Sequence, residues 1–359
     1  MGIDVIIVGG GISGFYCAYL LLEADPTLNI KIIEARDRIG GRLYSPNRHD
    51  MGGTWTWPRD DFLVMELVDK LQIPVFDADT FQEKNAYTQQ LRFVQGAQQL
   101  VKELARAVTP RVEVCLAEQV TRIVQNQQDQ DCGVEIDTHQ HNNHIKDHLQ
   151  LSCKYHARSV VLALPPRIIA ANITFEPPLK AQKCEMMVQT PTWMAGASKV
   201  FLEYASPFWK SSPSQHPLPL SMRDGIMLYD ASQYDPKRYV LCAFYAGIPV
   251  QITNESIQRD LLPQLQVIFG NTNEVFKYTS VMFHNWMDEK YTCEDKIRLQ
   301  HENRTCMGEM YSFGDEILRE PVSHKIYFAS TETENDYGHI QGALRSSKRV
   351  VDQMLYTKE

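Results

Sequence analysis

A glycine-rich turn near the N-terminus has the spacing of a loop that binds the phosphates of a dinucleotide. Gly9, Gly11 and Gly14 form the pattern G-x-G-x-x-G, after an apolar run at residues 5–8 and before a helical pattern at 15–23. The first glycine permits a tight turn, the second lets the backbone approach a pyrophosphate, and the third lets the helix pack on the strand. The helix N-terminus adds amide donors and a positive dipole end. The sequence therefore predicts a dinucleotide site.

An acidic residue stands where such a site needs one. Glu34 ends a second predicted strand, residues 29–33, and lies twenty positions after Gly14. A carboxylate at this place accepts hydrogen bonds from a ribose 2′-hydroxyl. Ile12 and Ser13, at the variable positions of the loop, are included in the expected cofactor contacts.

The composition limits the classes of protein. The chain has 359 residues, 43% of them hydrophobic and 22% charged, which suits two lobes around a cleft. A net charge of −8 disfavours nucleic acid or an anionic membrane as the main partner, and no apolar run reaches the ~20 residues of a membrane helix. The eight cysteines are scattered without a Cys-x-x-Cys pair, and the N-terminus lacks a basic region, so we expect reduced thiols and a cytoplasmic location.

Two further segments indicate FAD rather than NAD as the cofactor. The first continues from Glu34 through Ala35 and Arg36 to a second glycine–arginine turn, Gly41 and Arg42; the second reads Gly52, Gly53, Thr54, Trp55. Together they resemble the signature of the flavin amine-oxidase superfamily, which includes monoamine oxidases, polyamine oxidases and L-amino-acid oxidases. The resemblance implies that FAD is the cofactor, that Arg42 contacts its pyrophosphate, and that Gly52 and Gly53 let the chain pass close to the isoalloxazine ring.

The resemblance runs from residue 4 to about 355. It implies that the backbone at Val120 meets the adenine, within a predicted β-meander. An amphipathic helix is expected from Arg92 to about Val108, and a buried strand with a double proline at 159–166 leads into the substrate domain. The predicted strands of the meander are 112–116, 118–124, 133–137 and 149–155.

Two residues are expected beside the flavin. Lys199 follows the family-like segment 190–198, and the resemblance implies that it holds a water against flavin N5. Alternation along the strand places Lys199, Phe201 and Glu203 on one face, although a solvated lysine on an edge strand is the alternative. Trp286 resembles the family tryptophan near the flavin, and without the resemblance it would be a core aromatic.

The C-terminal segment resembles the family's flavin-closing turn and last helix. Thr331 and Glu332 lie in the turn Thr-Glu-Thr, and Glu332 is implied to contact the ribityl or pyrophosphate region. The helix that begins near His339 and Ile340 would point its N-terminus at the pyrimidine edge of the flavin and favour negative charge there. Trp286 and His339 would line the substrate face.

The sequence departs from the family at the site of covalent attachment and at the aromatic cage. Asp295 occupies the position of the flavin-linking cysteine of monoamine oxidases, and Cys293 is two residues away, so we expect non-covalent FAD. The two cage tyrosines are matched by Lys296 and His339. A histidine can present a flat face or act as an acid–base group, whereas the lysine cannot form a cage.

A third departure is a deletion. Only about a dozen residues connect Thr80 to Arg92, where larger relatives carry a helical insertion that roofs the substrate cavity. The cleft is therefore expected to be open, or roofed by a partner subunit in an oligomer, and to suit a bulky or carrier-bound substrate. A histidine-rich polar stretch at 137–147 is interpreted as a solvated hairpin loop, and no metal site is expected.

The predicted fold is α/β: a two-domain flavoprotein with a Rossmann-like dinucleotide-binding domain and a mixed-sheet substrate domain. The FAD domain takes residues 1–79, 92–180 and 288–359; the substrate domain takes 80–91 and 181–287.

The predicted activity is oxidation of the C–N bond of an amine or amino acid. A neutral amine gives hydride to flavin N5, the imine hydrolyses, and molecular oxygen reoxidises the flavin to give hydrogen peroxide. Two alternatives stay open: a flavin dehydrogenase or desaturase acting on a C–C bond of a bulky or carrier-bound intermediate, and a non-catalytic FAD-stabilised accessory subunit.

Overall fold

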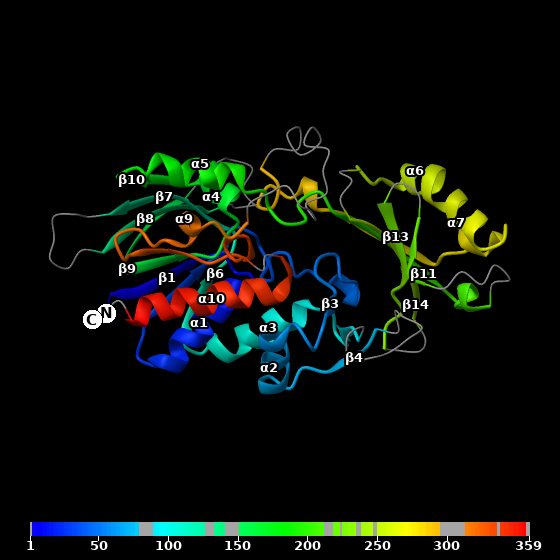
Figure 1. Cartoon of the computed structure of the whole chain (residues 1–359), viewed down its shortest axis with the longest axis horizontal. Coiled ribbons are helices and arrows are strands. Elements are labelled where there is room, and N and C mark those ends of the chain that lie inside the picture. Colours follow the sequence, from blue (N-terminus) through cyan, green and yellow to red (C-terminus); the bar gives the residue numbers. More distant parts are fainter. Residues whose placement is uncertain are drawn as a thin grey trace.

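The structure is a computed structural model that describes residues 2–78, 89–125, 133–140, 151–211, 218–222, 225–234, 238–246, 250–294, 313–335 and 338–356. Two lobes lie along its long axis (Figure 1). The large lobe contains both termini and the largest sheet, and the small lobe contains a separate antiparallel sheet with its own helices.

Five parallel strands form the centre of the large lobe. Their order is β6 (Val112–Cys115), β2 (Ile30–Ile33), β1 (Ile3–Val8), β9 (Leu151–Leu162), β16 (Ile326–Phe328). Strand β1 is apolar on both faces: Val5 and Ile7 pack into one core cluster, and Ile6 and Val8 into another. Burial on both faces is what a parallel sheet covered on two sides requires, and the structure confirms the predicted strand.

The predicted meander is partly wrong. Strand β6 pairs in parallel with β2 and takes no part in it; the meander consists of β7 (Glu118–Gln125), β8 (Val134–Gln140) and the first half of β9, with β10 (Thr174–Glu176) at its edge. The predicted strands near 149–155 and 159–164 are one continuous strand, β9. Strand β8 reaches only as far as Ala157 of β9, so the following residues, including the buried Val160, pair with β1 and β16 instead.

Helices cover both faces of the large sheet (Figure 1). On one face lie α1 (Ile12–Ala24), α3 (Gln98–Val108), α10 (His339–Tyr356) and α2 (Phe62–Lys70). The other face carries α4 (Pro166–Asn172), α5 (Ala181–Gln189) and α9 (Glu316–Arg319).

Helix α3 begins later than predicted. Arg92 belongs to strand β5 (Leu91–Phe93), which pairs with β3 (Trp55–Thr56) and β4 (Val75–Asp77). Gly96, with a φ of +81°, lies in the turn between β5 and α3, and this left-handed conformation separates the strand from the helix.

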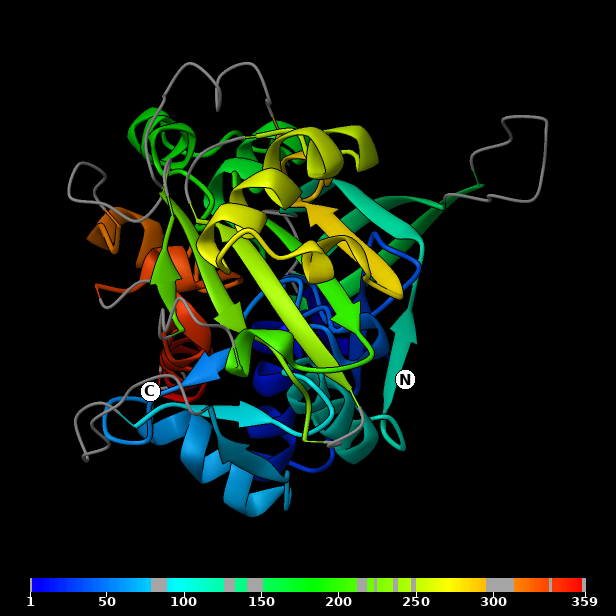
Figure 2. The same ribbon diagram turned by 90° about the vertical axis from the view of Figure 1, so that its right-hand side faces the viewer.

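The small lobe is built on a five-stranded antiparallel sheet, seen in front of the large lobe in Figure 2. Its strands are, in order, β12 (Leu220–Ser221), β13 (Ile226–Asp230), β14 (Tyr239–Tyr245), β11 (Ser198–Tyr204) and β15 (Ser280–Asn285). Val200, Leu202 and Tyr204 pack in one core cluster with residues of α7 (Leu262–Ile268). Phe201 faces the opposite side, in a cluster with Met51 and Trp286, which confirms the predicted alternation along β11.

Short helical segments complete the described elements. They are α6 (Asn254–Ser256), η1 (Pro46–Arg48), η2 (Phe208–Lys210), η4 (Ile257–Leu261), η5 (Asn273–Phe276), η6 (Trp286–Asp288) and η7 (Thr331–Thr333).

Candidate active site

A pocket of about 460 Å³ runs from the glycine-rich loop of the large lobe to the inner face of the small-lobe sheet. Most of the site residues predicted from the sequence line this pocket, and they come from seven separate segments of the chain. Those that line it are Gly9, Gly11, Ile12, Ser13, Glu34, Arg36, Gly41, Arg42, Gly52, Gly53, Thr54, Trp55, Lys199, Trp286, Thr331, His339 and Ile340.

Four predicted residues lie outside the pocket lining: Gly14, Ala35, Val120 and Glu332. A Cβ on Gly14 would lie 2.0 Å from the backbone oxygen of Gly9, so this glycine permits the close packing of α1 on β1. Val120 is buried in the core of the meander. Glu332 is completely buried and contacts Arg42, which does line the pocket.

The phosphate end of the pocket is made of backbone. Gly11 is the N-cap residue of α1 and offers no side-chain acceptor to the first-turn amides, so these donors face the pocket without a side-chain cap. Gly9 and Gly41 have φ values of +109° and +56°. A helix N-terminus of this kind binds phosphate through its amides and its dipole. The geometry fits the pyrophosphate of a dinucleotide.

Glu34 is buried beside this loop. Its Oε2 accepts a hydrogen bond from Gly10 N at 2.7 Å, and its Oε1 accepts one from Arg36 N at 2.8 Å. The two backbone donors fix the carboxylate at the carboxyl end of β2, where each oxygen keeps a second acceptor site for a ribose hydroxyl.

Lys199 is buried at the inner face of β11, with 2% of its surface exposed. Its Nζ donates to Asp50 O at 2.9 Å, to Gly52 O at 2.7 Å and to Thr54 Oγ1 at 2.7 Å. Burial, which disfavours the charged form, lowers the pKa of Lys199 to about 8. The lysine thus holds the loop of Gly52 and Gly53, and it is not the solvated edge residue of the alternative interpretation.

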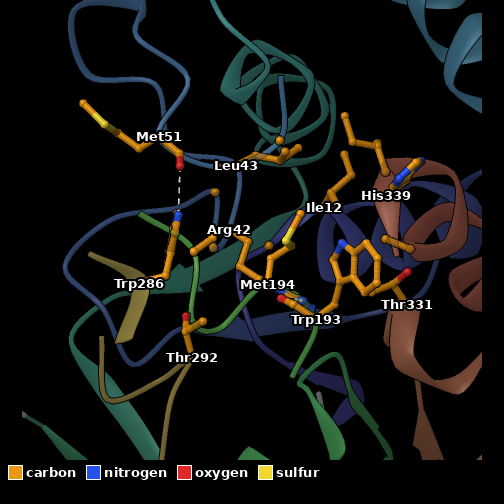
Figure 3. A pocket seen from close by; sticks show the side chains of 18 of the residues that line it. Ile12, Arg42, Leu43, Met51, Trp193, Met194, Trp286, Thr292, Thr331 and His339 are labelled. Carbon is orange, nitrogen blue, oxygen red and sulfur yellow. Dashed lines mark hydrogen bonds between the residues drawn. The ribbon is translucent and has the colours of Figure 1, made fainter. Parts of the chain in front are cut away.

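Trp286 fixes the same loop from the end of β15. Its Nε1 donates to the backbone oxygen of Met51 at 2.9 Å (Figure 3). A Cβ on Gly52 would lie 1.7 Å from Arg42 O and 3.2 Å from Cζ2 of Trp286, so only glycine fits between these two segments.

The far end of the pocket is aromatic, and the sequence analysis missed most of its side chains. Met227, Tyr229 and Phe244 come from neighbouring strands of the small-lobe sheet, and Phe244 stands directly opposite Lys199 on β14. Trp57 stacks on His339 with ring centroids 5.0 Å apart and an interplanar angle of 18°. His339 itself is exposed at the start of α10. Met227, Tyr229 and Phe244 follow the alternating pattern of a strand, which predicts a shared face within each strand. Their meeting at one pocket depends on the pairing register of the strands, which the sequence pattern does not give.

Several predictions fall on residues that the structure does not describe. They are Asp295, Lys296, residues 141–147 of the histidine-rich stretch and most of the connection between Thr80 and Arg92. Cys293 is described: it is buried in a small cluster with Ala195 and Met287 and does not line the pocket.

Neither a metal centre nor a membrane-spanning helix is found among the described residues. No group of three or more His, Cys, Asp or Glu side chains there is arranged to hold a metal ion. None of the described helices has the length and apolar character to cross a bilayer.

The pocket and fold agree with comparisons to known proteins. The sequence profile of the family "Flavin containing amine oxidoreductase" matches residues 74–355, and that of an NAD(P)-binding Rossmann-like domain matches residues 7–71. Flavin-containing amine oxidase B of Sus scrofa is 22% identical, covering 98% of this chain and 86% of its own. The probable flavin-containing monoamine oxidase A of Dictyostelium discoideum is 24% identical over 75% of this chain and 55% of its own.

Solved structures share the whole fold. Cyclohexylamine oxidase from Brevibacterium oxydans superposes with a TM-score of 0.74 at 17% identity, covering all of both chains. Wild-type putrescine oxidase bound to putrescine superposes with a TM-score of 0.72 at 18% identity, covering 99% of each chain.

The chain belongs to the flavin-containing amine oxidoreductase family. It is a flavoprotein oxidoreductase, FAD is its cofactor, and the predicted α/β fold with a Rossmann-like domain is confirmed.

Proposed function

We propose that this protein oxidises the C–N bond of an amine or amino acid, with molecular oxygen as the final acceptor. Bound FAD would supply the redox chemistry, as acceptor of a hydride equivalent from the carbon that bears the nitrogen and as donor of two electrons to oxygen. The amine becomes an imine, which takes up water to give a carbonyl compound and ammonia, and oxygen with two electrons and two protons becomes hydrogen peroxide.

One observation carries the proposal: the same pocket is lined by the phosphate loop and, under the small-lobe sheet, by aromatic side chains. Trp55, Tyr229 and Phe244 line this end, and Tyr229 is 1% exposed. Such a surface favours a neutral amine over an ammonium ion, because a charged group loses its hydration there. A neutral amine is also the form whose C–H bond can give up hydride.

We assign three residues to the reacting region. Trp286 and His339 face the substrate, and Lys199 orients a water at flavin N5. Because Nζ of Lys199 already has three protein acceptors, it must exchange one of them for the water. Thr54 Oγ1 is a side-chain hydroxyl on a rotatable bond, so it is the partner that can turn away.

The remaining assignments follow from the same geometry. We propose that FAD is held without a covalent bond, since Cys293 is buried away from the pocket lining. We further propose that the FAD domain comprises 1–79, 92–180 and 288–359, with 80–91 and 181–287 as the substrate domain. The five-stranded small-lobe sheet falls within 181–287, which supports this division, except that α5 at the start of that range packs on the large-lobe sheet.

The test is anaerobic mixing of the purified holoenzyme with putrescine, cyclohexylamine, benzylamine and a set of L-amino acids. Bleaching of the flavin by one of them, followed by peroxide formation when oxygen is admitted, is the expected result. Bleaching only by a bulky or carrier-bound compound without nitrogen at the reacting carbon would favour a C–C dehydrogenase. A flavin that none of these compounds reduces would contradict the proposed oxidation.

A further inference from the structure

One ion pair joins three distant segments of the chain at the pocket wall. Arg42 lies in the glycine–arginine turn, Glu332 in η7, and Trp193 just before β11. Arg42 Nη1 and Nη2 donate to Glu332 Oε1 and Oε2 at 2.7 and 3.2 Å. Arg42 Nη1 also donates to Trp193 O at 3.0 Å, and Trp193 N donates to Glu332 Oε1 at 2.9 Å. The pair therefore holds both backbone polar groups of Trp193.

Burial makes this pair obligatory. The Glu332 side chain is completely buried and that of Arg42 is 28% exposed. Removal of the guanidinium would leave a carboxylate without its cation in a low-dielectric environment, which is strongly unfavourable. Two parallel hydrogen bonds also fix the relative orientation of the two groups, so a movement of one is passed to the other.

The Trp193 ring is fixed from the opposite side. A Cβ on Gly338, whose φ is +78°, would lie 2.7 Å from Cε2 of Trp193, so the indole packs directly on the glycine backbone. The ring centroid lies 6.1 Å from that of His339. Trp193 lines the pocket near Met194 and Thr331 (Figure 3). Its indole is thus a wall of the pocket whose place depends on the Arg42–Glu332 pair.

We propose that Arg42 and Glu332 are positioning residues that set Trp193 in the pocket wall beside His339, a residue assigned above to the substrate face, and thereby couple FAD binding to the shape of that wall. The inference rests on the proposed function, which places FAD beside Arg42 and the amine beside His339. The Arg42 guanidinium faces the cofactor end and is also hydrogen-bonded to Trp193. When FAD binds and fixes the guanidinium, it therefore also fixes the position of the indole.

The first test reads the position of Trp193 without catalysis. The holoenzyme is labelled with 5-fluorotryptophan, and the Trp193 signal among the five tryptophans is assigned with W193F. In E332Q and R42K we expect the Trp193 resonance to shift or broaden, while that of Trp209, whose Nε1 is bound to Asp230, stays in place. Titration of the apoprotein with FAD should shift the Trp193 resonance in the wild type and shift it less in both variants.

The matched control is E203Q. Arg238 Nε and Nη2 donate to Glu203 Oε1 and Oε2 at 3.2 and 3.1 Å, which makes another two-pronged arginine–glutamate pair in the small lobe. Loss of this pair should leave the Trp193 resonance unchanged. If E203Q moves that resonance as far as E332Q does, the effect is general loosening and the proposal is wrong.

The second test uses anaerobic flavin reduction by cyclohexylamine. The apparent amine dissociation constant should rise about tenfold in E332Q, because the displaced indole no longer completes the pocket wall; tenfold corresponds to about 1.4 kcal/mol. W193A should show a similar rise, and the double variant W193A/E332Q should add little to either, because the two changes act through one element.

The outcomes separate the two proposals. A wild-type flavin that no amine reduces counts against the proposed oxidation, and the fluorine spectra still decide the coupling. A Trp193 resonance that is unmoved in both E332Q and R42K, with FAD affinity reduced, would make the pair a cofactor contact only and would overturn the inference.

Discussion

Lys199 and Thr54 are joined by a hydrogen bond of 2.7 Å from Nζ to Oγ1, which ties strand β11 of the small lobe to the loop that carries Gly52 and Gly53. Asp50 O and Gly52 O accept the other two donors of the ammonium group. A protonated lysine has three donor hydrogens, so all of them are used by this loop. The position of the loop therefore depends on a residue of the other lobe.

Replacement of Thr54 separates the two roles of Lys199. T54V should lower the free energy of unfolding by about 1–2 kcal/mol, because a buried donor loses its partner. T54S, which keeps the hydroxyl, should stay close to wild type. If Thr54 is the partner that gives way to a water, the rate of flavin reduction in T54V should stay within about twofold of wild type, whereas K199M should slow it about tenfold or more. Chemical denaturation and anaerobic stopped-flow absorbance measure the two effects. Equal slowing in T54V and K199M would contradict this division.

The pH dependence of stability should carry the signature of Lys199. Burial lowers its pKa to about 8 in the folded protein, against about 10.4 for an unfolded lysine. Between these two values the unfolded chain binds more protons, so stability rises with pH in this window. From pH 7.5 to 9.5 the wild type should gain about 2 kcal/mol relative to K199M. Lys183, whose pKa is also about 8, contributes equally to the stability of wild type and K199M, so its contribution cancels when the two proteins are compared. Urea unfolding at the two pH values measures it, and a gain equal in both proteins would assign the effect elsewhere.

Trp57 should affect amine binding more than chemistry. Its ring stacks on His339 at the pocket wall, and an aromatic pair contributes about 0.5–1.5 kcal/mol beyond its buried area. W57A should raise the apparent dissociation constant of benzylamine about tenfold or less, with the limiting reduction rate little changed. F62A is a suitable control, because Phe62 is exposed and does not line the pocket. A fall in the limiting rate with unchanged affinity would place Trp57 in the chemical step.

Cys293 should be dispensable for holding the flavin. It is buried beside Ala195 and Met287 and is not part of the pocket lining. C293S should therefore keep its yellow colour, and acid precipitation should release the flavin into the supernatant from both wild type and variant. If the wild-type pellet stays yellow after acid precipitation while the C293S pellet becomes colourless, the flavin is covalently linked through this sulfur.

Local patterns predicted the phosphate loop and the strand of Lys199 well. The apolar run at residues 5–8 with Gly9 and Gly11 specifies a strand, a turn and a helix within a few residues, and each is found in the structure. Lys199 and Phe201 could be placed on one face because strand alternation is local.

Long-range pairing was less accessible from the sequence. The first half of strand β9 alternates polar and apolar residues and the second half is apolar, so the sequence looks like two strands. The pattern changes because β8 ends opposite Ala157, and the residues beyond it pair within the parallel sheet. Phe244 reaches the pocket because it pairs opposite Lys199, a register set by contacts between distant segments. Trp57 and Trp193 lie outside the neighbouring strands, so the alternation of strand residues could not predict that they line the pocket.

The pairing of β9 with β16 has a consequence for how the protein is made. Val160 of β9 stands beside Ile326 of β16, and the whole small-lobe sheet is inserted between them in the sequence. Synthesis runs from the N-terminus, so the phosphate loop leaves the ribosome well before Thr331, His339 and Ile340. The nascent chain can thus present a nucleotide loop long before it can enclose a flavin, because the pocket is complete only after the segment with Thr331, His339 and Ile340 has been made.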